Sequence, residues 1–357
     1  MALFSSAPRS LCVLRLSAIG DVCHTVALVQ AIQRQWPTTQ ITWIMGKVEA
    51  SLLGDLPGIE TIIFDKKQGW QAYRSVWRQL HGRHFDALLH VQAALRASIL
   101  SLGIKARYKL GFDRQRANDA QWLFTNHKVA SPAAPHVVDG LMAFAAALGV
   151  NDVTPRWDVP VAPADDEWAA SVLGSKASMI IVPGSSKPYK NWTVAGYAAV
   201  ADHAAQAGLQ VVLCGSSSPA EQALAAQVEQ ACSCTVLNLT GKTSLKQMLA
   251  LIRRAQLLLA PDSGPVHMAT LVGTPVIALY AHHNPARVGP YGGQENVVSI
   301  YQTLVESEHA QALDTLPWRT RVKDEAAMEL ISTGMVVQAF ERLWSRLQKQ
   351  VSHASTV

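Results

Sequence analysis

The chain has 357 residues, of which 49% are hydrophobic and 16% charged, and its formal net charge is +5. This length predicts two domains, and so low a charged fraction excludes a largely disordered chain. No stretch approaches the roughly 20 apolar residues of a membrane span, and residues 1–9 lack the apolar core of a signal peptide. We therefore expect a cytoplasmic protein with an anionic partner, and attachment to a membrane surface stays open.

The first half of the chain alternates short apolar runs, typical of buried strands, with longer helical patterns. The predicted order is strand 11–16, helix 22–35, strands 41–45 and 59–64, helix 70–80, strand 85–91, helix 93–102 and strand 108–112. An arginine-rich loop over 113–136 and a helix over 137–148 follow. Alternation with short connections predicts parallel strands joined by crossover helices.

A proline-rich segment over 151–166 is typical of a connection between domains. We place the first domain at 1–155, a linker at 156–175, a second domain at 176–323 and a C-terminal helix at 324–350. The second domain repeats the rhythm, with strands over 179–182, 211–214, 236–239, 257–260 and 276–280 and helices over 194–207, 220–231, 245–254 and 266–272. Two such units predict an α/β protein with two Rossmann-like sheets.

Five cysteines form no even framework, so reduced thiols are expected. Cys232 and Cys234 stand one residue apart, but no second pair of Cys or His at zinc spacing accompanies them. We therefore expect no metal site.

Asp21 lies in the turn between the first strand and the first helix. In open α/β sheets ligands bind at the carboxyl ends of strands, so this turn is expected to line a ligand site. Asp21 is either a helix cap or a general base that accepts a proton from an attacking hydroxyl. Gly20 stands alone, so the turn is no dinucleotide fingerprint.

Two turns of the second domain have the composition of a diphosphate site. The turn over 183–192 combines glycine and serine with Lys187 and Lys190, although a solvated basic loop has the same composition. The turn over 260–270 enters a helix at Pro265, where free N–H groups and His267 favour an anion, and an ordinary capped helix is the alternative. Glu221 fits both a ribose-binding carboxylate and a favourable helix-start charge.

Basic residues gather in the first domain, where they fit a phosphorylated acceptor or a solvated face equally well. They are Lys66, Lys67, Arg96, Lys105, Arg107, Lys109, Arg114 and Arg116. Stacking aromatic residues are not interleaved with them, which disfavours nucleic acid as the partner.

The segments LRLSAIGDV over 14–22 and PDSGPVH over 261–267 resemble two motifs of the bacterial ADP-heptose:lipopolysaccharide heptosyltransferases. The resemblance extends over residues 11–345. It is strongest to the heptosyltransferase I type, which adds the first heptose to the Kdo sugar of the lipid A inner core. Segments 11–21, 65–67 and 102–112 are similar to the branch from bacteria whose single Kdo carries a phosphate.

The resemblance implies a GT-B fold, in which two Rossmann-like domains face each other across a central cleft and the C-terminal helix packs back on the first domain. It implies an inverting transfer of heptose from ADP-heptose to Kdo, or phosphorylated Kdo, of lipid A, with neither metal nor cofactor. The expected partners are thus ADP-heptose and Kdo-lipid A, with the enzyme peripheral on the cytoplasmic face of the inner membrane.

The resemblance also assigns residues to roles. Asp21 is implied as the catalytic base, and either Lys66 or Lys67 as an acceptor contact. From the gathered basic residues of the first domain, Arg114 and Arg116 are further acceptor-binding candidates. The implied donor-binding residues are Ser185, Ser186, Lys190, Glu221, Asp262, Ser263, Gly264 and His267. The family often has Thr where this chain has Ser in the first of these segments.

Three rival interpretations remain. One is a GT-B glycosyltransferase with another donor or a later core acceptor, as in the heptosyltransferase II and III types. Another is a sugar-nucleotide-binding protein without catalysis, which would tolerate loss of Asp21. A nicotinamide-dependent oxidoreductase is disfavoured because the chain lacks G-x-G-x-x-G.

Overall fold

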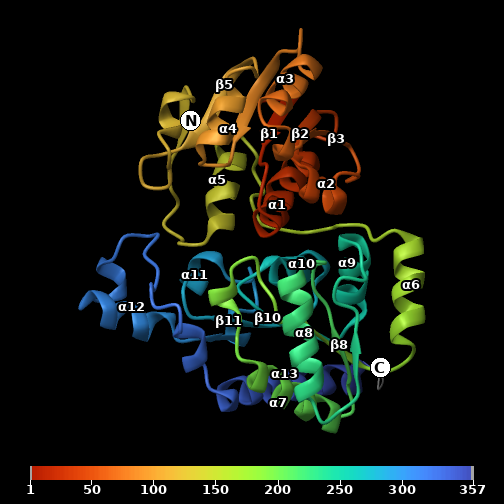
Figure 1. The fold of residues 1–357 in the computed structure, drawn as a ribbon. Helices are drawn as coiled ribbons and strands as arrows, with labels where there is room; N and C mark the ends of the chain where they lie inside the picture. Colours follow the sequence, from red (N-terminus) through yellow and green to blue (C-terminus); the bar gives the residue numbers. More distant parts are fainter. Residues whose placement is uncertain (1, 355–357) are drawn as a thin grey trace. The chain divides into compact units, whose positions relative to one another are not determined.

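The computed structural model describes residues 2–354, with side chains through residue 350. The chain divides into two compact units, unit 1 over Met1–Pro160 and unit 2 over Val161–Val357, each built on its own sheet (Figure 1). None of the helices within the described residues combines the length and the apolar character that crossing a membrane requires.

Unit 1 contains a six-stranded parallel sheet in the order β3-β2-β1-β4-β5-β6. Its strands are β1 Ser10–Leu14, β2 Gln40–Gly46, β3 Ile59–Phe64, β4 Phe85–His90, β5 Ala106–Phe112 and β6 His127–Val129. Its helices are α1 Ile19–Gln35, α2 Lys47–Leu53, α3 Trp70–Gln79, α4 Leu95–Ser101 and α5 Val137–Leu148, with 3₁₀ turns η1 Lys66–Gln68 and η2 Gln121–Leu123. Both faces of the sheet are covered, which explains the continuous apolar runs of β1 and β2.

Unit 2 repeats this plan with the order β12-β11-β10-β7-β8-β9, again all parallel. Its strands are β7 Ser178–Ile181, β8 Gln210–Leu213, β9 Val236–Asn238, β10 Leu257–Pro261, β11 Val276–Tyr280 and β12 Val297–Ser299. Its helices are α6 Pro163–Leu173, α7 Val194–Gln206, α8 Pro219–Ala231, α9 Leu245–Arg254, α10 Gly264–Val272, α11 Pro285–Val288, α12 Tyr301–His309 and α13 Thr333–Ala354. Short 3₁₀ turns are η3 Pro188–Lys190, η4 Gln294–Asn296, η5 Leu313–Thr315 and η6 Ala327–Leu330.

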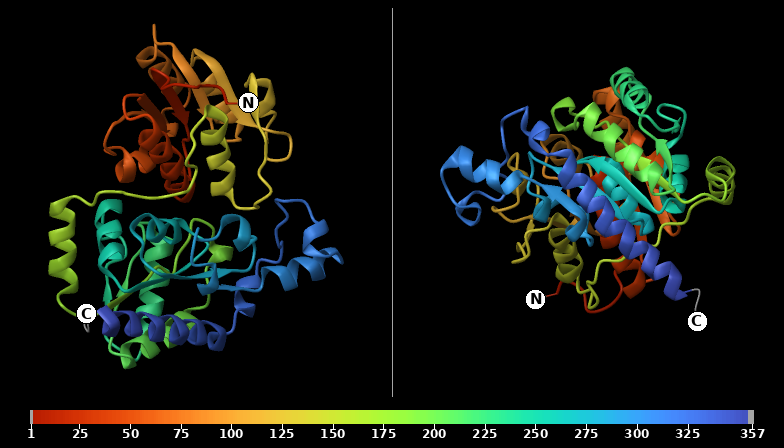
Figure 2. Two further views of the ribbon diagram at one scale, coloured as in Figure 1. Left: turned by 180° about the vertical axis from the view of Figure 1, so that it is seen from behind. Right: turned by 90° about the horizontal axis from the view of Figure 1, so that it is seen from below.

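The segment expected as a linker, 156–175, is only partly a connection. Its second half forms α6, which starts with Pro163 in the first turn and packs on α9, as Figures 1 and 2 both show. An ion pair of 2.6 Å joins Asp166 of α6 to Arg254 at the end of α9. The helix therefore belongs to unit 2.

The C-terminal helix begins at a different residue than expected, and it packs on a different part of the protein. It begins at Thr333 instead of residue 324, because 327–330 forms the separate turn η6. Its buried residues Val336, Ala339, Phe340 and Leu343 join the core that α7 and the strands of unit 2 form. Figure 2 shows α13 as a long dark-blue helix along one side of this unit. Its apolar face is thus covered by unit 2 and not, as expected, by the first domain.

Each sheet has one point at which strand addition changes direction. In unit 1 this point lies between β1 and β4, and in unit 2 between β7 and β10. The connections that leave the carboxyl ends of such neighbouring strands run to opposite sides and leave room for a ligand. These two switch points position the candidate site residues.

Candidate active site

Asp21 lies in the first turn of α1, beside the switch point of unit 1. Its carboxylate accepts a hydrogen bond from the backbone N–H of Ala18 at 3.1 Å and forms an ion pair with the guanidinium of Arg15. Asp21 is thus the third helical residue, and its side chain satisfies the backbone N–H of the N-cap residue Ala18. The side chain of Asp21 is nevertheless 43% exposed, so the carboxylate is accessible to a ligand.

Arg15 and the adjacent backbone are tied to the end of β4. The Arg15 guanidinium donates to the carbonyl of Val91 at 2.6 Å, and the side chain of Gln92 accepts from Leu16 N–H at 2.6 Å. The side-chain amide of Gln92 also donates to the Ser17 hydroxyl at 3.3 Å. These bonds cross the switch point, so Asp21 is paired with an arginine whose own position is fixed.

Glu49, in the first turn of α2, is a carboxylate that sequence reasoning missed. Its side chain is buried, and burial raises the pKa of Glu49 despite partial compensation by a backbone hydrogen bond and by Lys66. Gly46 has no room for a Cβ, which would lie 2.3 Å from Glu49 Oε2 and 2.5 Å from the Leu16 carbonyl oxygen. The end of β2 thus adds a second carboxylate near Asp21. Its helix is too short to show a sequence pattern.

Lys66 and Lys67 lie in η1, at the carboxyl end of the edge strand β3, and both are exposed. Asp65 begins this turn by accepting from the backbone N–H of Lys67 at 3.0 Å. The two ammonium groups are accordingly presented at the same edge of the sheet as Asp21. Either is available for an anionic ligand.

Arg116 contradicts its assignment to the acceptor. It is only 4% exposed, and its guanidinium donates to the carbonyls of Ala134 at 2.7 Å and His136 at 3.4 Å. It also lies against Gly140, where an added Cβ would come within 2.1 Å of Nη1. Arg116 holds the segment that enters α5, and its donors are therefore directed into the protein.

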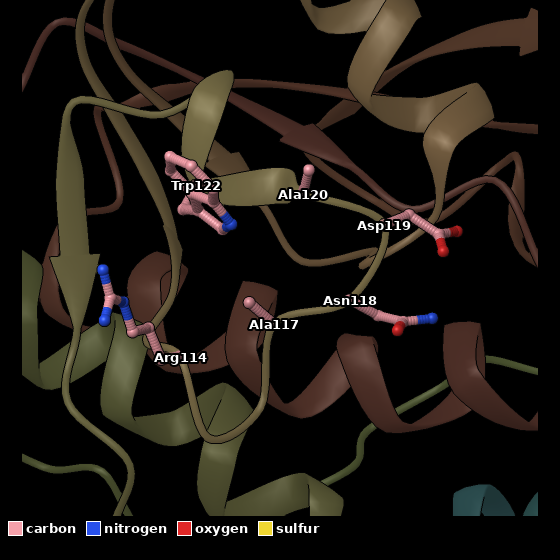
Figure 3. Close-up of a pocket in the computed structure, with 6 residues that line it drawn as sticks. All are labelled: Arg114, Ala117, Asn118, Asp119, Ala120 and Trp122. Carbon is pink, nitrogen blue, oxygen red and sulfur yellow. The ribbon is translucent and has the colours of Figure 1, made fainter.

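Arg114 is exposed and lines a pocket of about 350 Å³ together with Ala117, Asn118, Asp119, Ala120 and Trp122 (Figure 3). The indole of Trp122 is 46% exposed. Asp119 and Ala120 have φ values of 49° and 53°, a left-handed conformation that is rare for residues other than glycine and clusters at functional sites. An indole face and a guanidinium group in one pocket suit an anionic sugar.

The strongest charge cluster of unit 2 lies at its switch point. Asp262, directly after β10, has one carboxylate oxygen 2.7 Å from Lys190 Nζ and 2.7 Å from His283 Nδ1. Lys190 follows β7 and His283 follows β11, so three neighbouring strand ends supply the cluster. Lys190 and Asp262 were predicted as donor-binding, and His283 was missed.

The cluster keeps Asp262 ionised. Burial alone would raise the pKa of Asp262, but the hydrogen bond from His283 and the charge of Lys190 hold it well below its usual range. The neighbouring His282 plays a different part, since its Nε2 donates to the backbone carbonyl of Asp324 at 3.0 Å and its ring contacts Tyr189. Burial lowers the pKa of His282.

The remaining predicted residues follow the ends of β7, β8 and β10. Ser263 precedes α10, but its hydroxyl donates to the Pro261 carbonyl at 2.9 Å and does not cap the helix. Gly264 and Pro265 therefore begin a helix whose first N–H groups the Ser263 side chain leaves available to an anion. His267 is buried in that helix.

Ser185, Ser186 and Glu221 lie in the turns after β7 and β8. The Ser185 hydroxyl donates to the Lys187 carbonyl at 2.7 Å, while Ser186 is exposed. Both Glu221 oxygens accept from Ser216, one from its hydroxyl at 2.7 Å and one from its N–H at 2.9 Å. Glu221 also lies against Gly184, where a Cβ would come within 2.6 Å of its Cγ. Its carboxylate thus shapes this turn.

Asp202 lies beside the two cysteines that the sequence places one residue apart. One ligand atom each of Asp202, Cys232 and Cys234 lies within 4.8 Å of the others. The carboxylate accepts from the N–H groups of Ser233 and Cys234 at 2.8–3.1 Å. Both of its oxygens thus take part in hydrogen bonds that close this turn.

The chain is similar to known glycosyltransferases along its length. A family model described as glycosyltransferase family 9 (heptosyltransferase) matches residues 73–316. The lipopolysaccharide core heptosyltransferase OpsX of Haemophilus influenzae is 46% identical over 344 residues, which cover 96% of this chain and 99% of that protein.

Solved structures share the fold. The glycosyl transferase family 9 protein of Veillonella parvula matches with a TM-score of 0.77 at 21% identity, covering 96% of this chain and 97% of its own. The ADP-heptose lipopolysaccharide heptosyltransferase II of E. coli matches with a TM-score of 0.71 at 20% identity, covering 96% and 99%. The expected pair of Rossmann-like sheets is confirmed.

Proposed function

This chain belongs to glycosyltransferase family 9, the heptosyltransferases, and we propose that it transfers heptose from ADP-heptose to the Kdo of lipid A in lipopolysaccharide core synthesis. The observation that carries this proposal is the position of two motif carboxylates, Asp21 and Asp262, each at the switch point of its own sheet. Such points bind ligands in open α/β sheets.

Unit 2 carries the groups that a nucleotide-sugar donor requires. Negative charge grows on the diphosphate as its bond to the sugar breaks, and Lys190 together with the helix start at Gly264 offers positive charge and N–H donors to it. Ser185, Ser186 and the turn shaped by Glu221 flank the same strand ends. These residues support binding of ADP-heptose, the donor that the E. coli relative's name records.

Unit 1 carries the groups that an acidic acceptor requires. Lys66, Lys67 and Arg114 are exposed cations, and the pocket beside Trp122 offers an aromatic face to a sugar ring. Kdo is an acidic sugar, so its carboxylate, or a phosphate on it, matches these cations. We propose that the acceptor lies with its Kdo toward this pocket and its lipid at the membrane surface.

The proposed chemistry is inversion by direct displacement. Asp21 accepts the proton of the acceptor hydroxyl as that oxygen attacks the heptose from the face opposite ADP. Arg15 keeps the carboxylate oriented, and its exposed side remains free for the hydroxyl. Because base and donor residues belong to different units, unit 1 must bring the acceptor to the donor that unit 2 holds.

A transfer assay with mass-resolved products tests the proposal. The enzyme is supplied with ADP-heptose or a UDP-sugar as donor. The acceptors are Kdo-lipid A, Kdo-lipid A phosphorylated on Kdo, and an acceptor that already carries one heptose. We expect one heptose to be added to a Kdo acceptor from ADP-heptose alone. Transfer from the UDP-sugar alone, or only onto the heptose-bearing acceptor, would overturn the proposal in favour of another donor or a later core step.

A further inference from the structure

His283 occupies the loop between β11 and α11, beside the donor motif but outside it. Its imidazole Nδ1 lies 2.7 Å from the Asp262 oxygen that also accepts from Lys190. The side chains of Lys190, Asp262 and His283 are 16%, 15% and 19% exposed, so each is largely enclosed yet reachable. One carboxylate oxygen therefore joins two potential cations from two different loops.

The hydrogen bond to Asp262 sets the tautomer of His283. An ionised carboxylate only accepts, so Nδ1 carries the proton and Nε2 is left for another partner. Within residues 2–354 the ring makes no second hydrogen bond. Nε2 is consequently available to a ligand at the carboxyl edge of the sheet.

The net charge of Lys190, Asp262 and His283 determines how strongly they attract an anion. The charge of Lys190 and that of Asp262 offset each other, so a lysine–aspartate pair alone offers little net attraction to an anion. A protonated His283 adds the surplus positive charge and a second N–H donor. Other titratable groups around the ring are Lys190, Asp262 and His282. Of these, the buried His282 donates its Nε2 to a backbone carbonyl and adds no donor to the site.

We propose that His283 binds the diphosphate of the nucleotide-sugar donor, with Asp262 holding Nδ1 so that protonated Nε2 donates to a phosphate oxygen. The inference rests on the proposed function, because it names the diphosphate of that donor as the ligand. It assigns to His283 a role that the two family-like motifs of the sequence do not include.

Calorimetric binding of ADP-heptose, without acceptor, between pH 5.5 and 8.5 tests this role. The diphosphate of ADP-heptose is esterified at both ends, so it does not itself titrate in this range. We expect wild-type affinity to weaken as the pH rises through the range in which imidazole groups change charge. His283→Gln should bind roughly tenfold more weakly at the acidic end, as expected for loss of a charged hydrogen bond, and should lose this pH dependence.

Two further variants separate charge from structure. His283→Lys keeps a cation and is expected to restore part of the affinity without the pH dependence, whereas the neighbouring control His282→Gln should retain the wild-type pH dependence. Equal pH-dependent binding by wild type and His283→Gln would overturn the inference. So would equal weakening by Gln and Lys, which would indicate a structural role. Wild-type enzyme that binds ADP-heptose but transfers no heptose would instead overturn the proposed function and leave His283 in place.

Discussion

At the scale of single residues, two carboxylates at equivalent strand ends have different surroundings. Asp21 pairs with one arginine and stays 43% exposed, whereas Asp262 is largely enclosed and holds both Lys190 and His283. The first is accessible from solvent, and the second is an enclosed negative charge that accepts from two potential cations. The two motifs predicted Asp21 and Asp262 from sequence, and the basic turn over 183–192 predicted Lys190.

Other residues were beyond prediction because their environment depends on the fold. The strand order brings Lys190 to Asp262, which is 72 residues away in sequence, and it brings the unpredicted His283 to the same carboxylate oxygen. Arg116 was misassigned because a buried arginine that donates to carbonyls has the same sequence context as a surface arginine in a polar loop.

The buried His90, at the end of β4, should make the free energy of unfolding depend on pH. Burial lowers the pKa of His90 from 6.5 to about 3. Between these values the unfolded chain binds a proton that the folded chain does not, so the free energy of unfolding falls as the pH falls below about 6.5. The slope from one such group is at most about 1.4 kcal/mol per pH unit.

The variant His90→Gln isolates this contribution. Its free energy of unfolding, measured in urea at pH 7.5 and pH 4.5, should change less between the two values than that of the wild type. An unchanged difference between the two pH values would show that His90 is not the group responsible.

At the scale of elements, segments with a clear apolar pattern were predicted well and elements without one were not. The strands over 59–64 and 276–280 and the helices over 137–148 and 245–254 match β3, β11, α5 and α9 residue for residue. The short elements α2, β6, α11 and β12 show too few residues for a period, and α6 was hidden in a proline-rich segment.

Helix α13 predicts a large effect of one core substitution. Phe340 is 1% exposed in the core of unit 2, so Phe340→Ala should lower the free energy of unfolding by about 3–5 kcal/mol. Met335, 37% exposed in the same helix, supplies the control, and Met335→Ala should cost less than about 1 kcal/mol. Chemical denaturation compares them. Equal small losses would mean that α13 does not pack as described.

Substitutions in the loop over 113–126 should change the KM for the acceptor and leave the KM for the donor nearly unchanged. Arg114→Gln should raise the KM for phosphorylated Kdo-lipid A roughly tenfold, as loss of a charge-assisted hydrogen bond predicts. Trp122→Ala should raise it about two- to tenfold through loss of aromatic contact. The KM for ADP-heptose should stay within about twofold in both, since the residues proposed to bind the donor belong to unit 2. Steady-state kinetics that showed donor KM rising equally would remove the pocket from the acceptor site.

At the scale of the whole molecule, two similar sheets carry complementary chemistry. Unit 1 offers an exposed carboxylate and exposed cations, and unit 2 offers the enclosed charge cluster and the open start of α10. Sequence rhythm predicted the two units, and the motifs predicted the family that the comparisons show. The partner of the C-terminal helix was predicted wrongly, because an apolar face read from sequence does not identify what covers it.

The measurement that tests the central claim most directly is heptose transfer to Kdo-lipid A by wild type and Asp21→Asn, with ADP-heptose binding measured on the same preparations. Removal of a general base that acts in the displacement step should lower kcat by roughly 10²–10⁴-fold. Donor affinity should remain within about twofold, because the residues proposed to bind the donor lie in unit 2. Transfer by Asp21→Asn at the wild-type rate would contradict the account.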